Sequence, residues 1–162
     1  MSDNGLISKI LLKKMNKKIC IIGYGSIGRR HYEIISRLTT QKNIIVITKQ
    51  LEKFNFKKDI KFSIDFNPDY FIISNETFKH ENSIKFIEKN FKNKEILVEK
   101  PLFNSPSNLK IKKNNYYVGY NLRFNPILQE IKKKIKNKKI LNVKILCGSF
   151  LPNWRSNINY TK

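Results

Sequence analysis

The chain of 162 residues has no alanine, two cysteines, two histidines and one tryptophan. With so few sulfur and imidazole groups, neither a disulfide framework nor a metal site is expected. Cys20 and Cys147 lie far apart in apolar stretches, which is typical of buried thiols in a reducing cytoplasm. No apolar run approaches the roughly 18 residues that a membrane span needs. We therefore expect a cytoplasmic protein without metal and without a membrane segment.

Acidic residues are scarce, because 12 Asp and Glu stand against 33 Lys and Arg, giving a formal net charge of +21. The basic residues are 28 Lys and five Arg, and 25 Ile and 20 Asn accompany them, a bias towards AT-rich codons. Proteins that recognise nucleic acid favour Arg and interleave aromatic residues for stacking. The composition therefore favours a solvated basic surface that attracts anions over a nucleic-acid interface.

Short apolar runs alternate with amphipathic stretches along most of the chain. The pattern predicts strands at 19–22, 44–48, 70–74, 95–98 and 116–120, and helices at 27–38 and 81–91. Strands that are apolar on both faces and separated by helices are typical of a parallel sheet covered on two sides. We therefore predict an α/β fold with a doubly wound parallel sheet.

The region after Asn125 has a different pattern. Ile127, Leu128, Ile131 and Ile135 form an apolar stripe among many lysines, which predicts an amphipathic linker helix with a basic face. Residues 140–150 then alternate as a long strand, and no later strand in the sequence offers a partner. Because an unpaired strand is an aggregation liability, this pattern indicates that the partner strands lie outside the sequence.

A glycine-rich turn follows the first predicted strand and opens the first predicted helix. It is the GxGxxG sequence Gly23, Tyr24, Gly25, Ser26, Ile27 and Gly28, followed by Arg29 and Arg30. In this context, the first glycine permits a tight turn, the second lets the backbone approach a pyrophosphate and the third allows close packing of helix on strand. The free N–H groups and positive dipole of the helix start would hold the phosphates. A purely structural glycine turn is the alternative.

The end of the second predicted strand is expected to contact the adenosine ribose. A carboxylate usually stands there, about twenty residues beyond the glycines. This sequence has Thr48 and Lys49 instead, and no carboxylate before Glu52. Because a hydroxyl and an ammonium suit a 2'-phosphate better than an acid does, NADP is favoured over NAD as the cofactor.

Four segments together carry a family resemblance. They are Gly-Ser-Ile-Gly-Arg-Arg-His at 25–31, Ser-Asn-Glu-Thr-Phe-Lys-His at 74–80, Val-Glu-Lys-Pro-Leu at 98–102 and Gly-Tyr-Asn-Leu-Arg-Phe-Asn-Pro at 119–126. In this order and spacing they resemble the N-terminal half of the glucose–fructose oxidoreductase, inositol dehydrogenase and MocA family. The resemblance covers about 17–154, and residues 148–155 are similar to the opening of that family's second domain.

The resemblance implies an NAD(P)-dependent oxidoreductase that takes a hydride from a sugar, a polyol or a related hydroxyl compound. Lys100, between Glu99 and Pro101, would lie beside the nicotinamide and stabilise the reacting oxygen; the alternative is that it is one more surface lysine. The other residues expected at the cofactor or substrate are Ser74, Asn75, His80, Glu99, Asn121, Arg123, Trp154 and Arg155. His80 has a second interpretation, as a helix-start residue without a ligand.

Two departures from the family's pattern matter. Only fourteen residues separate Pro101 from Tyr116, where the family usually places a full helix. The family's second domain supplies a catalytic Asp and His, and the sequence stops before that region; His31, in the first helix, does not replace them. We therefore expect an N-terminal extension at 1–15, an NAD(P)-binding Rossmann domain at 16–122, and a linker helix with the start of a truncated C-terminal α+β domain at 123–162.

Three hypotheses follow from these observations. The first is the cofactor-binding half of an oxidoreductase, inactive without a C-terminal half or a complementing chain. The second is a free-standing dinucleotide-binding module or partner subunit, which as a homo-oligomer would bury residues 140–150. The third, less favoured, is a nucleic-acid binder that uses the lysine-rich helix, with binding that weakens steeply as salt rises.

Overall fold

The structure is a computed structural model that describes residues 16–50, 53, 55–146 and 148. The chain divides into two compact units, Met1–Tyr120 and Asn121–Lys162. The predictions for the N-terminal extension, for Cys147 and for Trp154 and Arg155 lie outside the described residues.

The first unit is built on a parallel sheet of six strands in the order β3-β2-β1-β4-β5-β6. The strands are β1 (Ile19–Ile22), β2 (Ile44–Ile47), β3 (Phe56–Lys57), β4 (Tyr70–Ile73), β5 (Glu95–Val98) and β6 (Asn115–Val118). Ile22 at the end of β1 pairs with Ile47 of β2 and Ile73 of β4, so these strands end level. The strand order reverses between β1 and β4, which is where a crevice forms in sheets of this kind.

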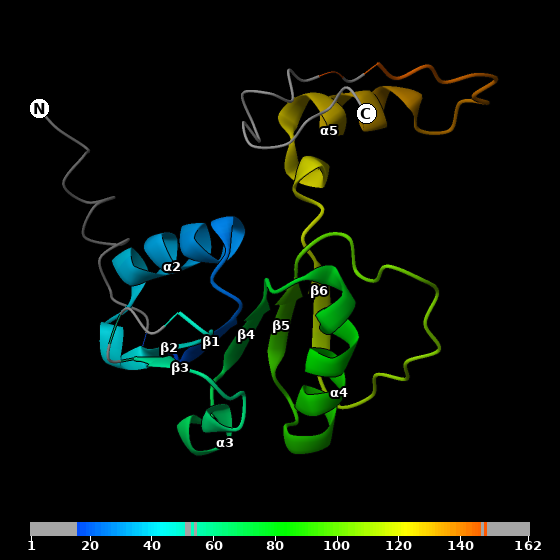
Figure 1. Cartoon of the computed structure of the whole chain (residues 1–162). Helices are drawn as coiled ribbons and strands as arrows, with labels where there is room; N and C mark the ends of the chain where they lie inside the picture. The colour runs from blue at the N-terminus through cyan, green and yellow to red at the C-terminus, as the bar shows by residue number, and fades with distance from the viewer. Residues whose placement is uncertain (1–15, 51–52, 54, 147, 149–162) are drawn as a thin grey trace, which may run out of the picture. The chain divides into compact units, whose positions relative to one another are not determined.

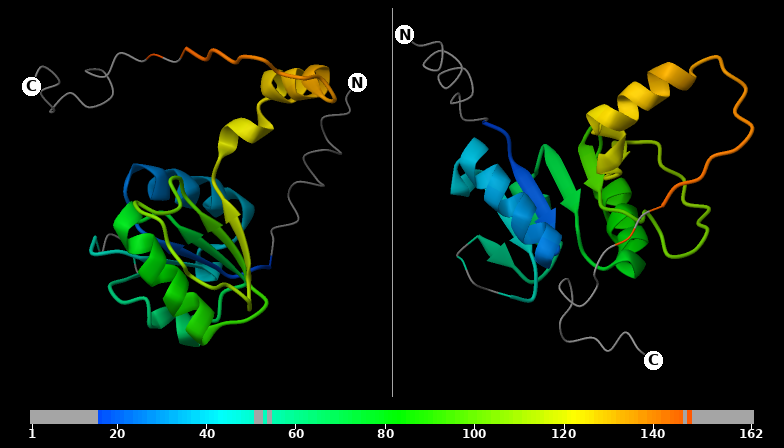
Figure 2. Two further views of the ribbon diagram at one scale, coloured as in Figure 1. Left: turned by 90° about the vertical axis from the view of Figure 1, so that its right-hand side faces the viewer. Right: turned by 90° about the horizontal axis from the view of Figure 1, so that it is seen from above.

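Two long helices cover opposite faces of this sheet, as Figures 1 and 2 show for α2 (Ser26–Leu38) and α4 (His80–Asn90). Alternate residues of β1 supply the two faces: Ile19 and Ile21 pack with α2, and Cys20 and Ile22 pack with α4. Burial of both faces explains why the central strand β1 and its neighbour β2 are apolar throughout, whereas the edge strand β6 is partly exposed. The short helix α3 (Phe62–Phe66) adds Phe66 to the α4 side.

The connection from β5 to β6 differs from the others. Residues 99–114 form neither helix nor strand, as their shortness in the sequence predicts. Three apolar side chains of this segment, Leu102, Phe103 and Leu109, pack against the core on the α4 face. Glu88 of α4 holds the end of the segment, because its carboxylate accepts hydrogen bonds from the backbone of Lys112 and Lys113.

The sequence predicted the main elements of the first unit and missed the small ones. All five predicted strands and both predicted helices are confirmed, although β6 ends at Val118 and not at Tyr120. The two-residue β3, the five-residue α3 and the 3-10 turns η1 (Gln41–Asn43) and η2 (Thr77–Lys79) were not predicted. Elements this short leave too few residues for a hydrophobic period.

The second unit contains η3 (Asn121–Phe124) and the predicted linker helix, α5 (Pro126–Ile135). Pro126 opens α5, and the Asn125 side chain caps it by accepting hydrogen bonds from the N–H groups of Ile127 and Leu128 at 2.9 and 3.3 Å. The strand expected at 140–150 does not form over its described residues, 140–146 and 148. A strand is stabilised by its neighbours, and alternation alone supplies none.

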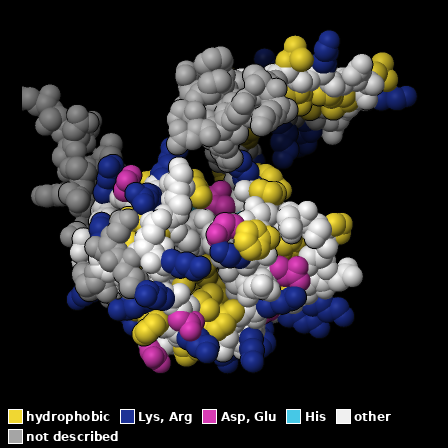
Figure 3. Space-filling model, viewed as in Figure 1, with side chains coloured by type: hydrophobic (Ala, Val, Ile, Leu, Met, Phe, Trp, Pro, Cys, Tyr) yellow, Lys and Arg dark blue, Asp and Glu magenta, His cyan; other side chains and the backbone are white. Residues whose placement is uncertain are grey.

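Lys and Arg side chains are spread over the face seen in Figure 3, with hydrophobic, polar and a few acidic side chains between them. No helix in the described part of the chain is long and apolar enough to cross a membrane. Nor do the described residues include a group of three or more side chains suited to a metal ion.

Cys20 is fully buried, and burial raises the pKa of its thiol.

Candidate functional site

The turn between β1 and α2 is packed against the loop that follows β4. Gly23 has a φ of +100°, and a Cβ there would lie 2.4 Å from the backbone nitrogen of Asn75. At Gly28 a Cβ would lie 2.2 Å from the carbonyl oxygen of Gly23. Only glycine fits these two positions, because the obstructing atoms belong to the backbone and cannot move aside.

Gly25 has the opposite surroundings. A Cβ there would meet nothing within 4 Å, and its φ of −73° suits any residue. Steric fit within the protein therefore does not explain a glycine here, whereas close approach of a ligand to the backbone does. Gly25 is also the N-cap residue of α2.

The start of α2 is suited to an anion. No side chain caps it and no acidic residue lies in its first turn, while Arg29 ends that turn and Arg30 begins the next. The first N–H groups of a helix lack partners within the helix, and its dipole places partial positive charge there. Cations in this turn are unfavourable unless an anion is close.

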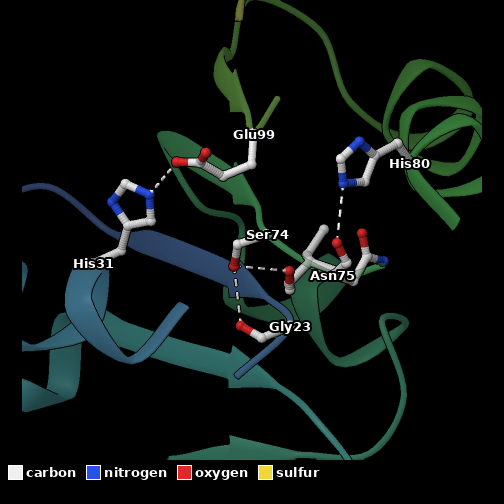
Figure 4. Close-up of polar contacts among 7 residues, drawn as sticks. Gly23, His31, Ser74, Asn75, His80 and Glu99 are labelled. Atoms are coloured by element: carbon white, nitrogen blue, oxygen red, sulfur yellow. Dashed lines mark hydrogen bonds and ion pairs between the residues drawn. The ribbon is translucent and has the colours of Figure 1, made fainter. Parts of the chain in front are cut away.

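Side chains after β4 bind the glycine turn from the other side (Figure 4). The Ser74 hydroxyl lies 3.2 and 3.1 Å from the carbonyl oxygens of Ile22 and Gly23, to which it donates. The Asn75 amide donates to Ser83 at 3.0 Å, while its Oδ1 is buried without a hydrogen-bond partner. Ser74 thus holds the turn, and Asn75 keeps an unused acceptor beside it.

His80 begins α4 and is 1% exposed. Its ring nitrogens lie 3.0 Å from the carbonyl oxygen of Asn75 and 3.1 Å from that of Leu102. The side chain therefore bridges the loop after β4 and the loop after β5, as Figure 4 shows for Asn75. Both ring nitrogens of His80 thus have backbone partners at the start of α4.

The loop after β5 carries Glu99 and Lys100. Glu99 Oε1 lies 2.8 Å from Nε2 of His31 on α2, and the carboxylate also packs against Gly119, where a Cβ would be 3.3 Å from Glu99 Oε2. Lys100 is exposed, and the Lys100–Pro101 peptide bond is cis. The contact between His31 and Glu99 was not predicted. The spacing contained a signal, because His31 follows Gly28 by three residues and so shares its helix face.

At the end of β2, polar groups face the start of α2. The Thr48 hydroxyl accepts a hydrogen bond from the N–H of Gln50 at 3.1 Å, and Arg29 donates to the Gln50 side chain at 3.0 Å. Lys49 is exposed. Across the crevice, a hydrogen bond from Lys79 lowers the pKa of Glu76, and the charge of Lys49 lowers it further.

An open groove of about 860 Å³ runs beside these residues on the α4 side of the sheet. Its lining includes Ile22 and Ile47 at the strand ends, Asn75, and the aromatic side chains Phe78 and Phe86. Six of its eleven lining residues are polar or charged, among them Lys58, Asp59 and Lys79, and it lies at the carboxyl ends of the strands, where sheets of this kind bind ligands. The sequence did not predict this groove, because its walls come from four separate segments.

The predicted site residues fall into two groups. The glycine turn, Thr48, Lys49, Ser74, Asn75, Glu99 and Lys100 all follow the carboxyl ends of β1, β2, β4 and β5 in the first unit, and His80 packs behind the β4 loop. Asn121 and Arg123 lie in η3 of the second unit, where the Arg123 guanidinium stacks 5.7 Å from the centre of the Phe124 ring.

Comparisons with known proteins identify the fold. No family profile and no curated protein sequence matches the chain. Among solved structures it is similar to apo scyllo-inositol dehydrogenase from Lactobacillus casei, with a TM-score of 0.58 and 18% identity over 81% of this chain and 44% of that one. It is also similar to the WlbA (WbpB) dehydrogenase from Thermus thermophilus, solved with NAD and UDP-GlcNAcA, with a TM-score of 0.57 and 18% identity over 76% of this chain and 48% of that one.

The chain therefore spans less than half the length of either dehydrogenase. At this identity the likeness establishes a Rossmann-like α/β fold of the kind found in these enzymes.

Proposed function

We propose that the chain binds a nicotinamide dinucleotide and is the cofactor-binding part of an oxidoreductase that acts on a CH–OH group of a sugar, a polyol or a related compound. The observation that carries the proposal is the glycine turn at the point where the strand order reverses. Gly23 and Gly28 are required by packing, whereas Gly25 faces open space. The dehydrogenase neighbours, one of them solved with NAD, support the same function.

The residues present fit such a cofactor. The uncapped start of α2, with Arg29 and Arg30 close to it, would hold the pyrophosphate. The part of the groove beside Ile47 would take part of the adenosine half, which belongs on the β2 side of the crevice. The unpartnered acceptor of Asn75, after β4, would face the nicotinamide half. Glu99 and Lys100, at the end of β5, stand on the nicotinamide half.

When bound, the cofactor supplies the hydride acceptor for oxidation of the hydroxyl carbon. Lys100 is proposed to stabilise negative charge on the substrate oxygen as the hydride leaves. Its exposed ammonium is free to turn towards a substrate. Because the chain spans less than half the length of its neighbours, we assign the proton acceptor and the substrate pocket to a further domain or chain.

Thr48 and Lys49 lead us to propose NADP as the preferred cofactor. Lys49 and Arg29 place two cations near the end of β2, and no carboxylate in the described part of that loop opposes them. Glu76 lies on the opposite side, but Lys79 holds its carboxylate at 2.7 Å. We expect Lys49→Glu to reverse the preference in favour of NAD.

The experiment is a titration of the whole chain with NADPH and with NADH, followed by nicotinamide fluorescence. Because a chain of charge +21 attracts any anion, it should be run at about 0.1 M and about 0.5 M salt. Saturable binding that persists at the higher salt and is tighter for NADPH is expected.

Two substitutions of Gly25 serve as controls for the titration. Gly25→Asp should abolish binding, because it places a carboxylate where the pyrophosphate is proposed to lie, while Gly25→Ala should leave the fold unchanged and weaken binding. Both variants should retain the circular-dichroism spectrum of the parent chain, since Gly25 has space around it. A folded parent chain that binds neither cofactor, or binding that survives Gly25→Asp, would contradict the proposal.

A further inference from the structure

The hydrogen bond between His31 and Glu99 connects helix α2, which is proposed to hold the phosphates, with the loop after β5, which carries Lys100. The two side chains are 19% and 16% exposed, and the atoms Nε2 and Oε1 lie 2.8 Å apart. Because a carboxylate only accepts, Nε2 of His31 carries the hydrogen. The contact links the second turn of the proposed phosphate-binding helix to the residue that precedes Lys100 (Figure 4).

The carboxylate is held from several sides. The N–H of Glu99 donates to the carbonyl oxygen of Ile73 at 2.9 Å, which fixes its backbone at the end of the sheet. Its side chain packs against Gly119, where the nearest contact of an added Cβ would be 3.3 Å. With His31 on a third side, the carboxylate has a defined position.

This position lies on the nicotinamide half of the crevice. A Rossmann sheet binds one nucleotide on each side of the strand reversal, with the adenosine on the side of the second strand. Here the reversal is between β1 and β4, and Glu99 follows β5 on the opposite side from β2. The nicotinamide ring is the part of the cofactor that changes charge, because it is cationic when oxidised and neutral when reduced.

We infer that Glu99, positioned by His31, sets the relative affinity of the chain for oxidised and reduced cofactor. The inference rests on the proposed function. A fixed carboxylate favours the cationic, oxidised ring, whereas the neighbouring Lys100 ammonium opposes it. Arg29 on the same helix is directed elsewhere, since it donates to Gln50 and stacks 5.1 Å from the centre of the Tyr24 ring. His31 is therefore a positioning residue that acts through Glu99.

The test measures dissociation constants for NADP+ and NADPH on the same protein, NADPH by fluorescence and NADP+ by its displacement of NADPH. Glu99→Gln removes the charge and keeps the shape. It should lower the ratio of oxidised to reduced affinity about threefold to tenfold, the size of one partly screened charge interaction. Glu95→Gln, at the other end of the same strand, is the matched control and should leave the ratio unchanged.

Substitutions of His31 test its positioning role through the same affinity ratio. His31→Leu should move the ratio part of the way towards the Glu99→Gln value, and His31→Gln, which retains an N–H donor, should restore it. In the Glu99→Gln background, His31→Leu should have no further effect on the ratio. A purely structural role predicts instead that both cofactor forms lose affinity equally.

The outcomes separate this inference from the function on which it rests. If the parent chain binds neither form saturably, the proposed function and the inference both fail. If it binds both forms and Glu99→Gln leaves the ratio unchanged, only the inference fails. Should Glu99→Gln not fold, the ratio in His31→Leu decides in the same way, because an unchanged ratio overturns the inference.

Discussion

Two connections between strands of the same sheet are packed in different ways. The connection from β1 through α2 begins with a turn in which backbone touches backbone: Gly23 lies against Asn75, and Gly28 lies against Gly23. The connection from β5 to β6 has no helix, and a carboxylate on α4 fastens its end. The first connection tolerates no added atom at Gly23 or Gly28, while the second depends on a few polar contacts and on three apolar side chains that pack against the core.

This difference matches what each connection has to do. The glycine turn positions the helix start that is proposed to hold phosphates, and an error there would move every N–H group at once. Beyond Glu99 and Lys100, the segment at 101–114 covers the core beside α4, where Leu102, Phe103 and Leu109 pack. Close backbone packing thus occurs where ligand geometry is proposed to matter, and a polar clamp suffices elsewhere.

The largest effect is expected in the glycine turn. Gly23→Ala should lower the free energy of unfolding by about 3 kcal/mol or more, because its φ of +100° and its contacts with Asn75 and Ser74 both oppose a side chain. Gly25→Ala should change it by less than about 0.5 kcal/mol, because the site is open. Urea unfolding of both variants checks this. Equal losses at the two positions would mean that the turn is not packed as described.

A smaller loss is expected at the polar clamp. Glu88 accepts four hydrogen bonds: from the backbone of Lys112 at 3.0 Å and Lys113 at 3.2 Å, from the Asn114 amide at 2.8 Å and from the Tyr116 hydroxyl at 3.1 Å. Glu88→Ala should cost about 1–2 kcal/mol, because two of these bonds are exposed to water.

The matched control is Glu81→Ala on the same helix. Its carboxylate pairs with Lys85 at 2.6 Å in an exposed position and has one further hydrogen bond, with Ser107, so only a small change in the urea midpoint is expected. Hydrogen exchange should also become faster at residues 112–114, which Glu88 contacts, in Glu88→Ala and not in Glu81→Ala. If the two variants behave alike, Glu88 does not hold this segment.

The sequence predicted the turn between β1 and α2 in more detail than the connection from β5 to β6. The glycines, the strand before them and the helix after them form a local pattern with a known mechanism, so the turn could be predicted residue by residue. The absence of a helix at 99–114 was also predictable, from length alone. The role of Glu88 was not, because its partners are 24 to 28 residues away and three-dimensional packing selects them.

The candidate site shows the same limit. The glycine turn was predicted from its local sequence and Lys100 from the family resemblance, and they follow the carboxyl ends of β1 and β5. The pairing of His31 with Glu99 spans 68 residues. Glu99 was expected at the cofactor, but its contact with His31 is made by the fold and was not predicted.

Acid should weaken the polar clamp selectively. Burial acts to raise the pKa of Glu88, but hydrogen bonds from Lys112, Asn114, Lys113 and Tyr116 outweigh it and lower the pKa below its usual value. A depressed pKa in the folded state contributes stability above the unfolded pKa of about 4.3, and this contribution is lost as pH falls through the folded value. The stability gap between the parent chain and Glu88→Gln should therefore be widest at pH 7 and narrow towards pH 3. Urea midpoints across that range measure it, and a gap that stays constant would contradict the assignment.

The smallest effect is expected from lengthening the β5–β6 connection. Two glycines inserted between Asn104 and Ser105, both exposed, lengthen a connection of 16 residues without helix or strand by two. Loop-closure entropy grows with the logarithm of length, so the cost should be about 0.1 kcal/mol, within the error of a urea titration. The same insertion between Tyr24 and Gly25 should prevent cofactor binding and destabilise the fold, because it displaces Gly28 from Gly23. If the two insertions lower the free energy of unfolding equally, the β5–β6 segment tolerates a change of length no better than the glycine turn. The apolar contacts of Leu102 and Phe103 would then contribute more to stability than the hydrogen bonds of Glu88.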